Sequence, residues 1–335
     1  MKNDSFPFKA GDYVVFDHIG KGGMAEIFLA RYVGPLSEGK TVVLKKIHSY
    51  LAKIPQFVKA LTNEARIMDK IQSPFVTKIV DLKVEGENAY IAMEYVEGVD
   101  LNRLLGLFSR HRIPVPETFI FHVVSSILQG LEAVHESKGP DGKLLNLIHL
   151  DLSPGNILVS FSGEVKICDF GVATTSELTQ IIFKEGEIRG KLSYMSPEQA
   201  AGLPLDCRSD IFSTGIIMWE LLAGRKMYSS KDKNEVHRMA LRGDCPPLEE
   251  KRYQDQHVLE RILSKALARE PDERYGSALQ FHDDLMDYIQ QRRLVLSQIA
   301  IGQLLEQHFS EEILQVRYER ERILSSILPP EKELG

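Results

Sequence analysis

Hydrophobic positions fall into two different patterns along the chain. Between residues 11 and 97 they form short runs rich in β-branched and aromatic residues, bounded by Gly, Pro and charged turns, which is typical of strands. The predicted strands are YVVF, AEIFLARY, TVVLKKI, FVTKIVDLKV and AYIAMEYV. Between the third and fourth runs, FVKALTNEARIMDKI repeats apolar residues at roughly helical spacing. This part of the chain is therefore predicted to be a small β-rich lobe with one main helix.

From Asp100 onward the pattern becomes mostly helical, and strand-like pieces occur only around 157–168. A larger helical lobe is therefore predicted, with the GluGlyValAsp stretch after Val96 as the hinge between the two lobes. The helices expected from the spacing of apolar residues cover 117–136, 210–223, 257–267 and 277–292.

The tail, residues 293–335, is also amphipathic. We expect Ser310 to cap a helix that begins with Glu311 and Glu312, and Pro329–Pro330 to stop it. The tail is expected to pack on the helical lobe, and a dimer or regulator surface is the alternative. Its apolar residues at helix-like spacing are Ile301, Leu304, Leu305, Ile313, Leu314, Ile323 and Leu324.

Composition narrows the class of protein. The chain has 335 residues, 43% hydrophobic and 26% charged, as in a globular protein of two or three structural units. A formal charge of −6 argues against nucleic acid or anionic membrane as a partner, because such binders carry a basic excess. Three scattered cysteines indicate a reducing compartment. With neither a signal pattern nor an apolar run of about 18 residues, a cytoplasmic protein is expected.

Two features of the first lobe are candidates for holding phosphate groups. The loop Gly20-Lys21-Gly22-Gly23-Met24-Ala25 lies between two predicted strands, where backbone N–H groups of a hairpin could cover phosphates. Such glycines alone more often mark a simple turn. Lys45 lies mid-strand in TVVLKKI and Glu64 lies on the following helix, so the two can pair across the lobe. An incidental surface ion pair is the alternative for these two residues.

Three oxygen-bearing side chains carry the clearest chemistry. HLDLSPGN places Asn156 five residues after Asp151, and CDFG places Asp169 thirteen residues after Asn156. Phosphoryl transfer needs a metal ion to neutralise oxygen charge and a carboxylate to orient the attacking hydroxyl. Two carboxylates and an amide oxygen provide ligands suited to Mg²⁺. This spacing is hard to obtain by accident, and it predicts a phosphoryl-transfer site.

The order of these motifs resembles that of the bacterial Hanks-type Ser/Thr protein kinases, over residues 11 to about 290. The resemblance implies an α+β, two-lobed protein-kinase fold, with an N-lobe of about 11–97, a C-lobe of about 98–290 and a helical C-terminal extension, 291–335. It implies transfer of the γ-phosphate of ATP to Ser/Thr hydroxyls of protein substrates, with autophosphorylation. The matching pieces are IGKGGMAEIFLA, VVLK, NEARIM, YIAMEYVEGVDL, HLDLSPGN, DFG, YMSPEQA, RSDIFSTGIIMWELLAG and EPDERY.

The resemblance also implies a role for each matching residue. Asp151 would orient the hydroxyl, Asn156 and Asp169 would hold Mg²⁺ or Mn²⁺, and Lys45 paired with Glu64 would position ATP. The other residues implied to bind nucleotide are Ile19, Gly20, Lys21, Gly22, Gly23, Met24 and Ala25 over the phosphates, Ile27, Val43 and Leu158 beside the purine, Met93 as gatekeeper, Glu94 and Val96 through backbone groups to adenine, and Asp100 at the ribose.

Further residues are implied to support this site. Glu198 would pair with Arg274, and Asp210 would hold the backbone of the HLDLSPGN loop. These residues position other groups and do not react. A hydrophobic column that aligns the lobes would contain His149, Phe170, Met68 and Ile79.

Leu150 departs from the family pattern, because many of these kinases carry an Arg there that receives an activation-loop phosphate. With Leu at this position, that switch is absent. We therefore expect that no single phosphate on Thr174, Thr175, Ser176 or Thr179 activates the protein through this route.

Ser153 and Lys191 are two further departures, since the family usually has Lys and Thr at these positions. We predict that they are linked, with the Lys191 ammonium reaching toward Asp151 and the γ-phosphate, where a charge would stabilise the transition state. A Lys191 side chain that points to solvent is the alternative. The insertion 136–147 contains Gly-Pro-Asp-Gly and predicts a small hairpin beside this loop.

The sequence leaves two other functions open. A pseudokinase scaffold would bind nucleotide and partners without efficient transfer, with the tail as its interaction surface. A small-molecule kinase is the third possibility, although YMSPEQ and Arg274 resemble the branch that acts on peptides. Protein substrates, and a homodimer or regulator bound through the C-terminal helices, are the expected partners.

Overall fold

The computed structural model describes residues 6–21, 25–34, 39–85, 88–139, 141–169, 192–249 and 252–327. Two compact units divide the chain. The first unit contains residues 1–70, 77–97 and 305–335, and the second contains 71–76 and 98–304. The first is rich in strands and the second in helices, which confirms the predicted α+β class.

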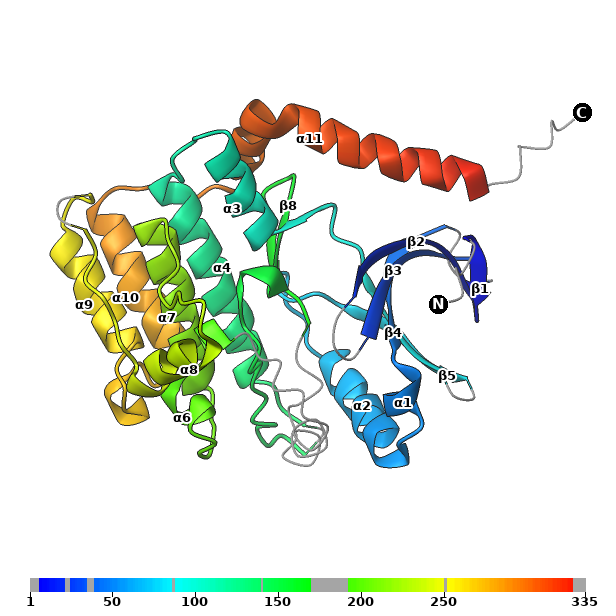
Figure 1. Cartoon of the computed structure of the whole chain (residues 1–335), viewed down its shortest axis with the longest axis horizontal. Helices are drawn as coiled ribbons and strands as arrows, with labels where there is room; N and C mark the ends of the chain where they lie inside the picture. Colours follow the sequence, from blue (N-terminus) through cyan, green and yellow to red (C-terminus); the bar gives the residue numbers. More distant parts are fainter. Residues whose placement is uncertain are drawn as a thin grey trace, which may run out of the picture. The chain divides into compact units, whose positions relative to one another are not determined.

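The first unit is built on one antiparallel sheet with the order β1-β2-β3-β4-β6-β5 (Figure 1). All five predicted strands form, although β5 begins four residues later than its sequence run. β1 was not predicted, since three residues are too few to show alternation. The strands are β1 (Phe8–Ala10), β2 (Tyr13–Lys21), β3 (Ala25–Tyr32), β4 (Thr41–Ile47), β5 (Ile79–Glu85) and β6 (Asn88–Glu94).

Alternation along the strands separates the two faces of this sheet. One face carries a buried cluster that includes Phe28, Val42 and Leu44. Lys45 follows Leu44 and therefore lies on the other face, because successive side chains of a strand point to opposite sides. Two helices accompany the sheet, α1 (Ser49–Ala52) and the predicted helix α2 (Pro55–Met68), which begins at a proline as helices often do.

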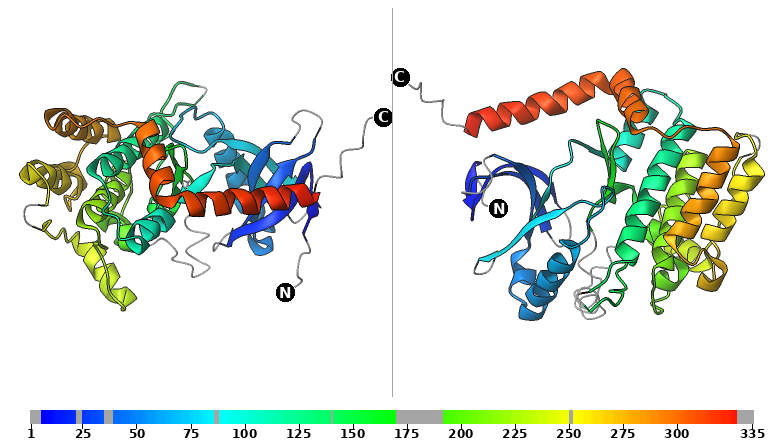
Figure 2. Two further views of the ribbon diagram at one scale, coloured as in Figure 1. Left: turned by 90° about the horizontal axis from the view of Figure 1, so that it is seen from above. Right: turned by 180° about the vertical axis from the view of Figure 1, so that it is seen from behind.

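The second unit is mainly helical, and α4, α7, α9 and α10 lie side by side in it (Figures 1 and 2). α7 is buried nearly all round because α4, α9 and α10 contact it, which explains its strongly apolar sequence. The helices are α3 (Leu101–Arg110), α4 (Glu117–His135), α6 (Pro197–Ala200), α7 (Arg208–Ala223), α8 (Lys233–Arg242), α9 (Gln256–Ala266) and α10 (Ala278–Gln291).

A small sheet in the second unit carries the predicted strand pieces. Its antiparallel order is β7-β8-β9, formed by Gly98–Asp100, Ile157–Ser160 and Val165–Ile167. The predicted hairpin in the 136–147 insertion is confirmed, since Lys138 pairs with Leu144 and the Leu145 amide donates to the Ser137 carbonyl at 2.9 Å.

The last helix, α11 (Gln298–Ile327), forms the predicted helical extension. It leaves helical geometry at Phe309 (φ −133°, ψ 27°), one residue before Ser310, the predicted cap. The expectation that the tail packs on the helical lobe is wrong for its later part, since residues from 305 onward group with the first unit. No helix among the described residues has the length and hydropathy needed to span a bilayer.

The start of α11 packs closely on the turn between β8 and β9. Gly163 has φ +89°, and a Cβ added there would lie 2.1 Å from the Gln298 carbonyl oxygen. On the helix side, a Cβ at Gly302 would lie 3.0 Å from the Ser162 carbonyl. Glycine at both positions therefore allows the backbones to approach each other.

Candidate active site

The HLDLSPGN loop brings Asp151 and Asn156 into direct contact. The Asn156 amide nitrogen donates to the Asp151 carboxylate Oδ2 at 2.9 Å and to the Asp151 carbonyl at 2.8 Å. Asn156 closes the short 3₁₀ turn Pro154–Asn156 and is 7% exposed. Because both bonds use the nitrogen, the amide oxygen is the atom of Asn156 that could bind a metal ion.

Asp210 of α7 holds the start of this loop, which confirms its predicted role. Its carboxylate accepts from the His149 amide at 2.7 Å and from the Leu150 amide at 2.9 Å. The ring of His135 on α4 lies 2.9 Å from the same carboxylate. Burial alone would raise the pKa of Asp210, but the neighbouring His135 and His149 lower it overall. The anchor is therefore an ionised carboxylate at neutral pH.

Asp169 follows a segment that is tied to the same loop. The Cys168 amide donates to the Asn156 carbonyl at 2.9 Å, and the His149 ring lies 3.1 Å from the Cys168 carbonyl oxygen. Asp169 has φ +55°, a conformation that non-glycine residues adopt rarely. These bonds join the HLDLSPGN loop, which carries Asp151 and Asn156, to the segment that carries Asp169. All three residues belong to the second unit.

The oxygen donors of Asn156 and Asp169 fit a hard cation that is held partly by protein side chains and partly by a bound phosphate group. Among the described residues, no three His, Cys, Asp or Glu side chains form a complete metal site. Mg²⁺ commonly takes one or two side-chain oxygens together with substrate phosphates and water. The amide oxygen of Asn156 and the carboxylate of Asp169 are oxygen donors of this kind, so the residues present fit the predicted ion.

In the first unit, the sheet face opposite the buried cluster carries the predicted nucleotide-binding side chains. Lys45 pairs with Ile27 on β3, and Val43 pairs with Met93 on β6, so these four side chains share one face. All four are partly buried. Gly20 pairs with Ile27 at the end of β2, which brings the start of the predicted phosphate loop to the same part of the sheet.

Other predicted residues of this unit fall outside the described part of the chain. Gly22, Gly23 and Met24 are among them, and so is the side chain of Glu64 on α2, so the Lys45–Glu64 pair stays a prediction. Of their described neighbours, Ile19 is exposed, Lys21 forms an exposed ion pair with Glu26 at 3.4 Å, and Ala25 is buried.

The structure refines the roles expected in the linker, residues 94–100, which contains the predicted hinge. The Glu94 amide donates to the Lys78 carbonyl at 2.9 Å, so any contact from the Glu94 backbone to adenine uses its carbonyl. Val96 follows in the stretch after β6. Asp100 caps α3 by accepting from the Arg103 amide at 3.0 Å, a role that was not predicted. It also pairs with Leu158 across β7 and β8.

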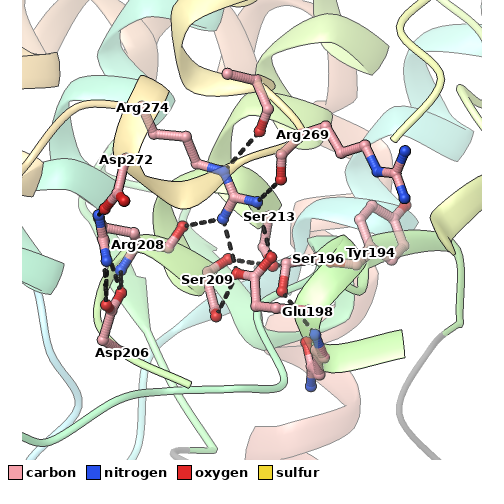
Figure 3. Close-up of polar contacts among 12 residues, drawn as sticks. Tyr194, Ser196, Glu198, Asp206, Arg208, Ser209, Ser213, Arg269, Asp272 and Arg274 are labelled. Carbon is pink, nitrogen blue, oxygen red and sulfur yellow. Dashed lines mark hydrogen bonds and ion pairs between the residues drawn. The ribbon is translucent and has the colours of Figure 1, made fainter. Parts of the chain in front are cut away.

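The predicted Glu198–Arg274 pair is confirmed as a buried bidentate ion pair (Figure 3). Both guanidinium N–H groups reach the carboxylate at 2.7 Å, and Ser209 donates to it at 2.7 Å. Burial alone would raise the pKa of Glu198, but these hydrogen bonds and the charge of Arg274 lower it. The pair fixes α6 against the segment before α10.

Contacts of α11 with the linker were not predicted. Arg317 donates to the Glu97 carboxylate at 2.7 Å, and Arg320 lies 3.4 Å from its other oxygen. The Arg320 guanidinium also lies over the Tyr95 ring, 4.7 Å from its centroid. Burial raises the pKa of Glu97, yet the two arginines lower it overall. Only the cluster of Arg and Glu residues in the tail could have hinted at such a contact.

Residues 170–191, which the resemblance implies form the activation segment, lie outside the described residues. Lys191 and Phe170 therefore stay predictions, as do the four hydroxyl residues of that segment. Ser153, the proposed counterpart of Lys191, is fully buried.

Comparison with known proteins agrees with this geometry. A family model described as "Protein kinase domain" matches residues 13–301. The chain is 35% identical over 302 residues to "Tyrosine-protein kinase MasK" of Myxococcus xanthus, covering 90% of this chain and 47% of that protein. It is 28% identical to "Serine/threonine-protein kinase PknB" of Mycobacterium leprae, covering 84% and 43%.

The chain thus spans less than half the length of these relatives. Among solved structures, the PknI kinase domain of Mycobacterium tuberculosis matches with a TM-score of 0.62 and 22% identity, covering 84% of this chain and 97% of that one. This likeness confirms the predicted fold.

Proposed function

This chain belongs to the protein kinase family, and we propose that it transfers the γ-phosphate of ATP to serine and threonine hydroxyls of proteins. The observation that carries the proposal is the Asp151–Asn156 contact, anchored by Asp210. In this role the Asp151 carboxylate orients the attacking hydroxyl and accepts its proton. Asn156 keeps that carboxylate in one orientation through the hydrogen bond at 2.9 Å.

ATP with Mg²⁺ or Mn²⁺ is the proposed cofactor pair. When bound, the ion neutralises charge on the phosphate oxygens. Asn156 and Asp169 would supply its protein ligands, because both carry oxygen donors and their segments are joined through Cys168. Lys45, paired with Glu64, is assigned to the α- and β-phosphates, and the loop 20–25 to the phosphate cover. Ile27, Val43 and Leu158 are assigned to the purine.

The acceptor hydroxyl needs a direct test, because the relatives differ in their names. MasK is named a tyrosine kinase and PknB a serine/threonine kinase, and the identity to MasK is the higher. Serine and threonine are supported by the PknB-type relatives and by the SPEQ segment. The protein should be incubated with γ-labelled ATP and Mg²⁺, alone and with a mixed peptide library, and then hydrolysed to amino acids. Label mainly on phosphotyrosine would show that tyrosine, and not serine or threonine, is the acceptor.

A pseudokinase scaffold is the alternative to catalysis. Leu150 and Ser153 motivate it, yet neither is a metal ligand or the orienting carboxylate. We expect wild type to label itself and Asp151→Asn not to. Equal labelling of the two proteins, or none in either, would favour the scaffold. Replacing Thr174, Thr175, Ser176 and Thr179 together by alanine should leave substantial activity. The reason is that Leu150 carries no charge that could pair with a phosphate on any of them.

The proposed organisation is a kinase domain at 11–290 and a helical extension at 291–335 that binds a regulator or a second copy. The contacts of Arg317 and Arg320 with Glu97 support a link between the extension and the linker. Each of these partly exposed surface pairs contributes only about 0.2–1 kcal/mol, so a partner could displace them. Two measurements on Glu97→Ala test this proposal: the molecular mass by light scattering, and KM for ATP from the dependence of the rate on ATP. If both match wild type, the proposal is contradicted. The three scattered cysteines of the sequence support a cytoplasmic location.

A further inference from the structure

Leu150, directly before Asp151, has an unusual backbone conformation. Its φ of +61° lies in the left-handed region, which a branched side chain such as leucine disfavours. A residue in this region persists only when its surroundings hold it there. The groups that hold Leu150 therefore also determine where the Asp151 carboxylate lies.

Two side chains hold the backbone of Leu150, one at its amide and one at its carbonyl. The Asp210 carboxylate accepts from its amide at 2.9 Å, as described above. The amide nitrogen of Gln199 on α6 donates to the Leu150 carbonyl at 2.8 Å. The peptide between Leu150 and Asp151 is thus fixed by Gln199, through the carbonyl that forms part of it.

Gln199 is itself rigidly placed. The Ser196 hydroxyl caps α6 and accepts from the Gln199 amide at 3.3 Å. The preceding residue, Glu198, is locked to Arg274 by two bonds of 2.7 Å (Figure 3). The Gln199 side chain therefore extends from a fixed support to the loop.

We propose that Gln199 is a positioning residue for phosphoryl transfer, a role that rests on the proposed function. Its amide keeps Leu150 left-handed, and this conformation aims the Asp151 carboxylate. Because position 150 carries Leu, the loop has no cation there that a phosphate could hold. Gln199 supplies a link between α6 and the loop that needs no phosphate.

The test compares removal of the donor with relief of the backbone strain. Gln199→Ala and Gln199→Glu both abolish the donated hydrogen bond, and the second keeps the shape of the side chain. Each should lower kcat by about ten- to a hundredfold, since small displacements of catalytic groups have effects of this size. KM for ATP should stay unchanged, because the hydrogen bond that both variants lose is the one to the Leu150 carbonyl.

Leu150→Gly provides the rescue, because glycine adopts positive φ without the penalty of a Cβ. In the Gln199→Ala background it should restore most of the lost kcat. Gln315→Ala, which removes an exposed glutamine amide on α11, is the control and should match wild type. Hydrogen exchange in a peptide covering 148–156 should become faster in Gln199→Ala.

Each outcome decides one question. If wild type transfers phosphate and Gln199→Ala matches its kcat, the positioning role is overturned and the proposed function stands. If kcat falls but Leu150→Gly does not restore it, Gln199 acts only on stability and the inference is likewise overturned. If wild type transfers no phosphate, the proposed function fails, and the inference falls with it. Loss of kcat together with rescue supports the proposal.

Discussion

Replacing Arg274 by alanine tests how a buried charge pair holds α6. Arg274 is fully buried and Glu198 nearly so. The guanidinium also donates to three backbone carbonyls, those of Ala268, Arg208 and Arg269, at 2.7–3.0 Å. The substitution therefore leaves a buried carboxylate without its cation, held by the Ser209 hydroxyl and the Glu198 backbone amide, and three carbonyls that lose a hydrogen bond.

The expected loss is about 4 kcal/mol in the free energy of unfolding at neutral pH. Breaking a buried ion pair by removing one partner costs about 3–5 kcal/mol, because the remaining charge stays buried. Arg208→Ala is the matched control. Its pairs with Asp206 and Asp272 are largely exposed, so it should cost no more than about 1 kcal/mol.

The pH dependence gives a second check. In wild type the pKa of Glu198 is lower in the folded than in the unfolded state. The ionised carboxylate therefore adds to the free energy of unfolding above the unfolded pKa of about 4.3, and this stabilisation is lost as the pH falls through the folded pKa. In Arg274→Ala the same carboxyl is buried without a cation, which raises its folded pKa. Protonation then stabilises the variant, so its deficit should shrink between about pH 7 and pH 4.5.

Trp219 makes the measurement specific to the second unit. It is the one tryptophan of the chain and is fully buried on α7. Urea unfolding followed by its fluorescence should show the large deficit of Arg274→Ala and the small one of Arg208→Ala. Equal deficits in the two variants, or a deficit of Arg274→Ala that does not change with pH, would refute this reasoning.

Two further predictions concern α11 and the activation segment. Gly163→Ala should loosen the start of α11, because its Cβ meets the Gln298 carbonyl, whereas Gly142→Ala shares the positive φ but meets nothing within 4 Å. Faster hydrogen exchange of α11 in the first variant alone supports this packing, and equal exchange in both speaks against it. Lys191→Ala should lower turnover far more than ATP affinity, and Ser153→Lys should partly restore it. An unchanged rate in Lys191→Ala would end that hypothesis.

Residues tied to a motif could be predicted from the sequence. Glu198 with Arg274, and Asp210 with the loop backbone, were predicted through the family resemblance, whose motifs carry these residues in a fixed order. The five long strands were found because their apolar residues have one buried face. Each of these predictions rests on a constraint that is visible locally or through a resemblance.

Contacts that depend on tertiary packing could not be predicted. Gln199 is an ordinary polar residue in the sequence, and only the fold brings its amide to Leu150. The bonds between Arg317 and Glu97 join residues that are 220 positions apart. The interruption of α11 at Phe309, by contrast, lies one residue before Ser310, the cap that local chemistry predicts.

Single-turnover transfer from labelled ATP tests the central claim most directly. Wild type and Asp151→Asn should be compared with enzyme in excess over nucleotide, together with nucleotide affinity measured separately. The account predicts that Asp151→Asn binds nucleotide as wild type does but transfers phosphate about 10²- to 10⁴-fold more slowly. Equal transfer rates in the two proteins would contradict it.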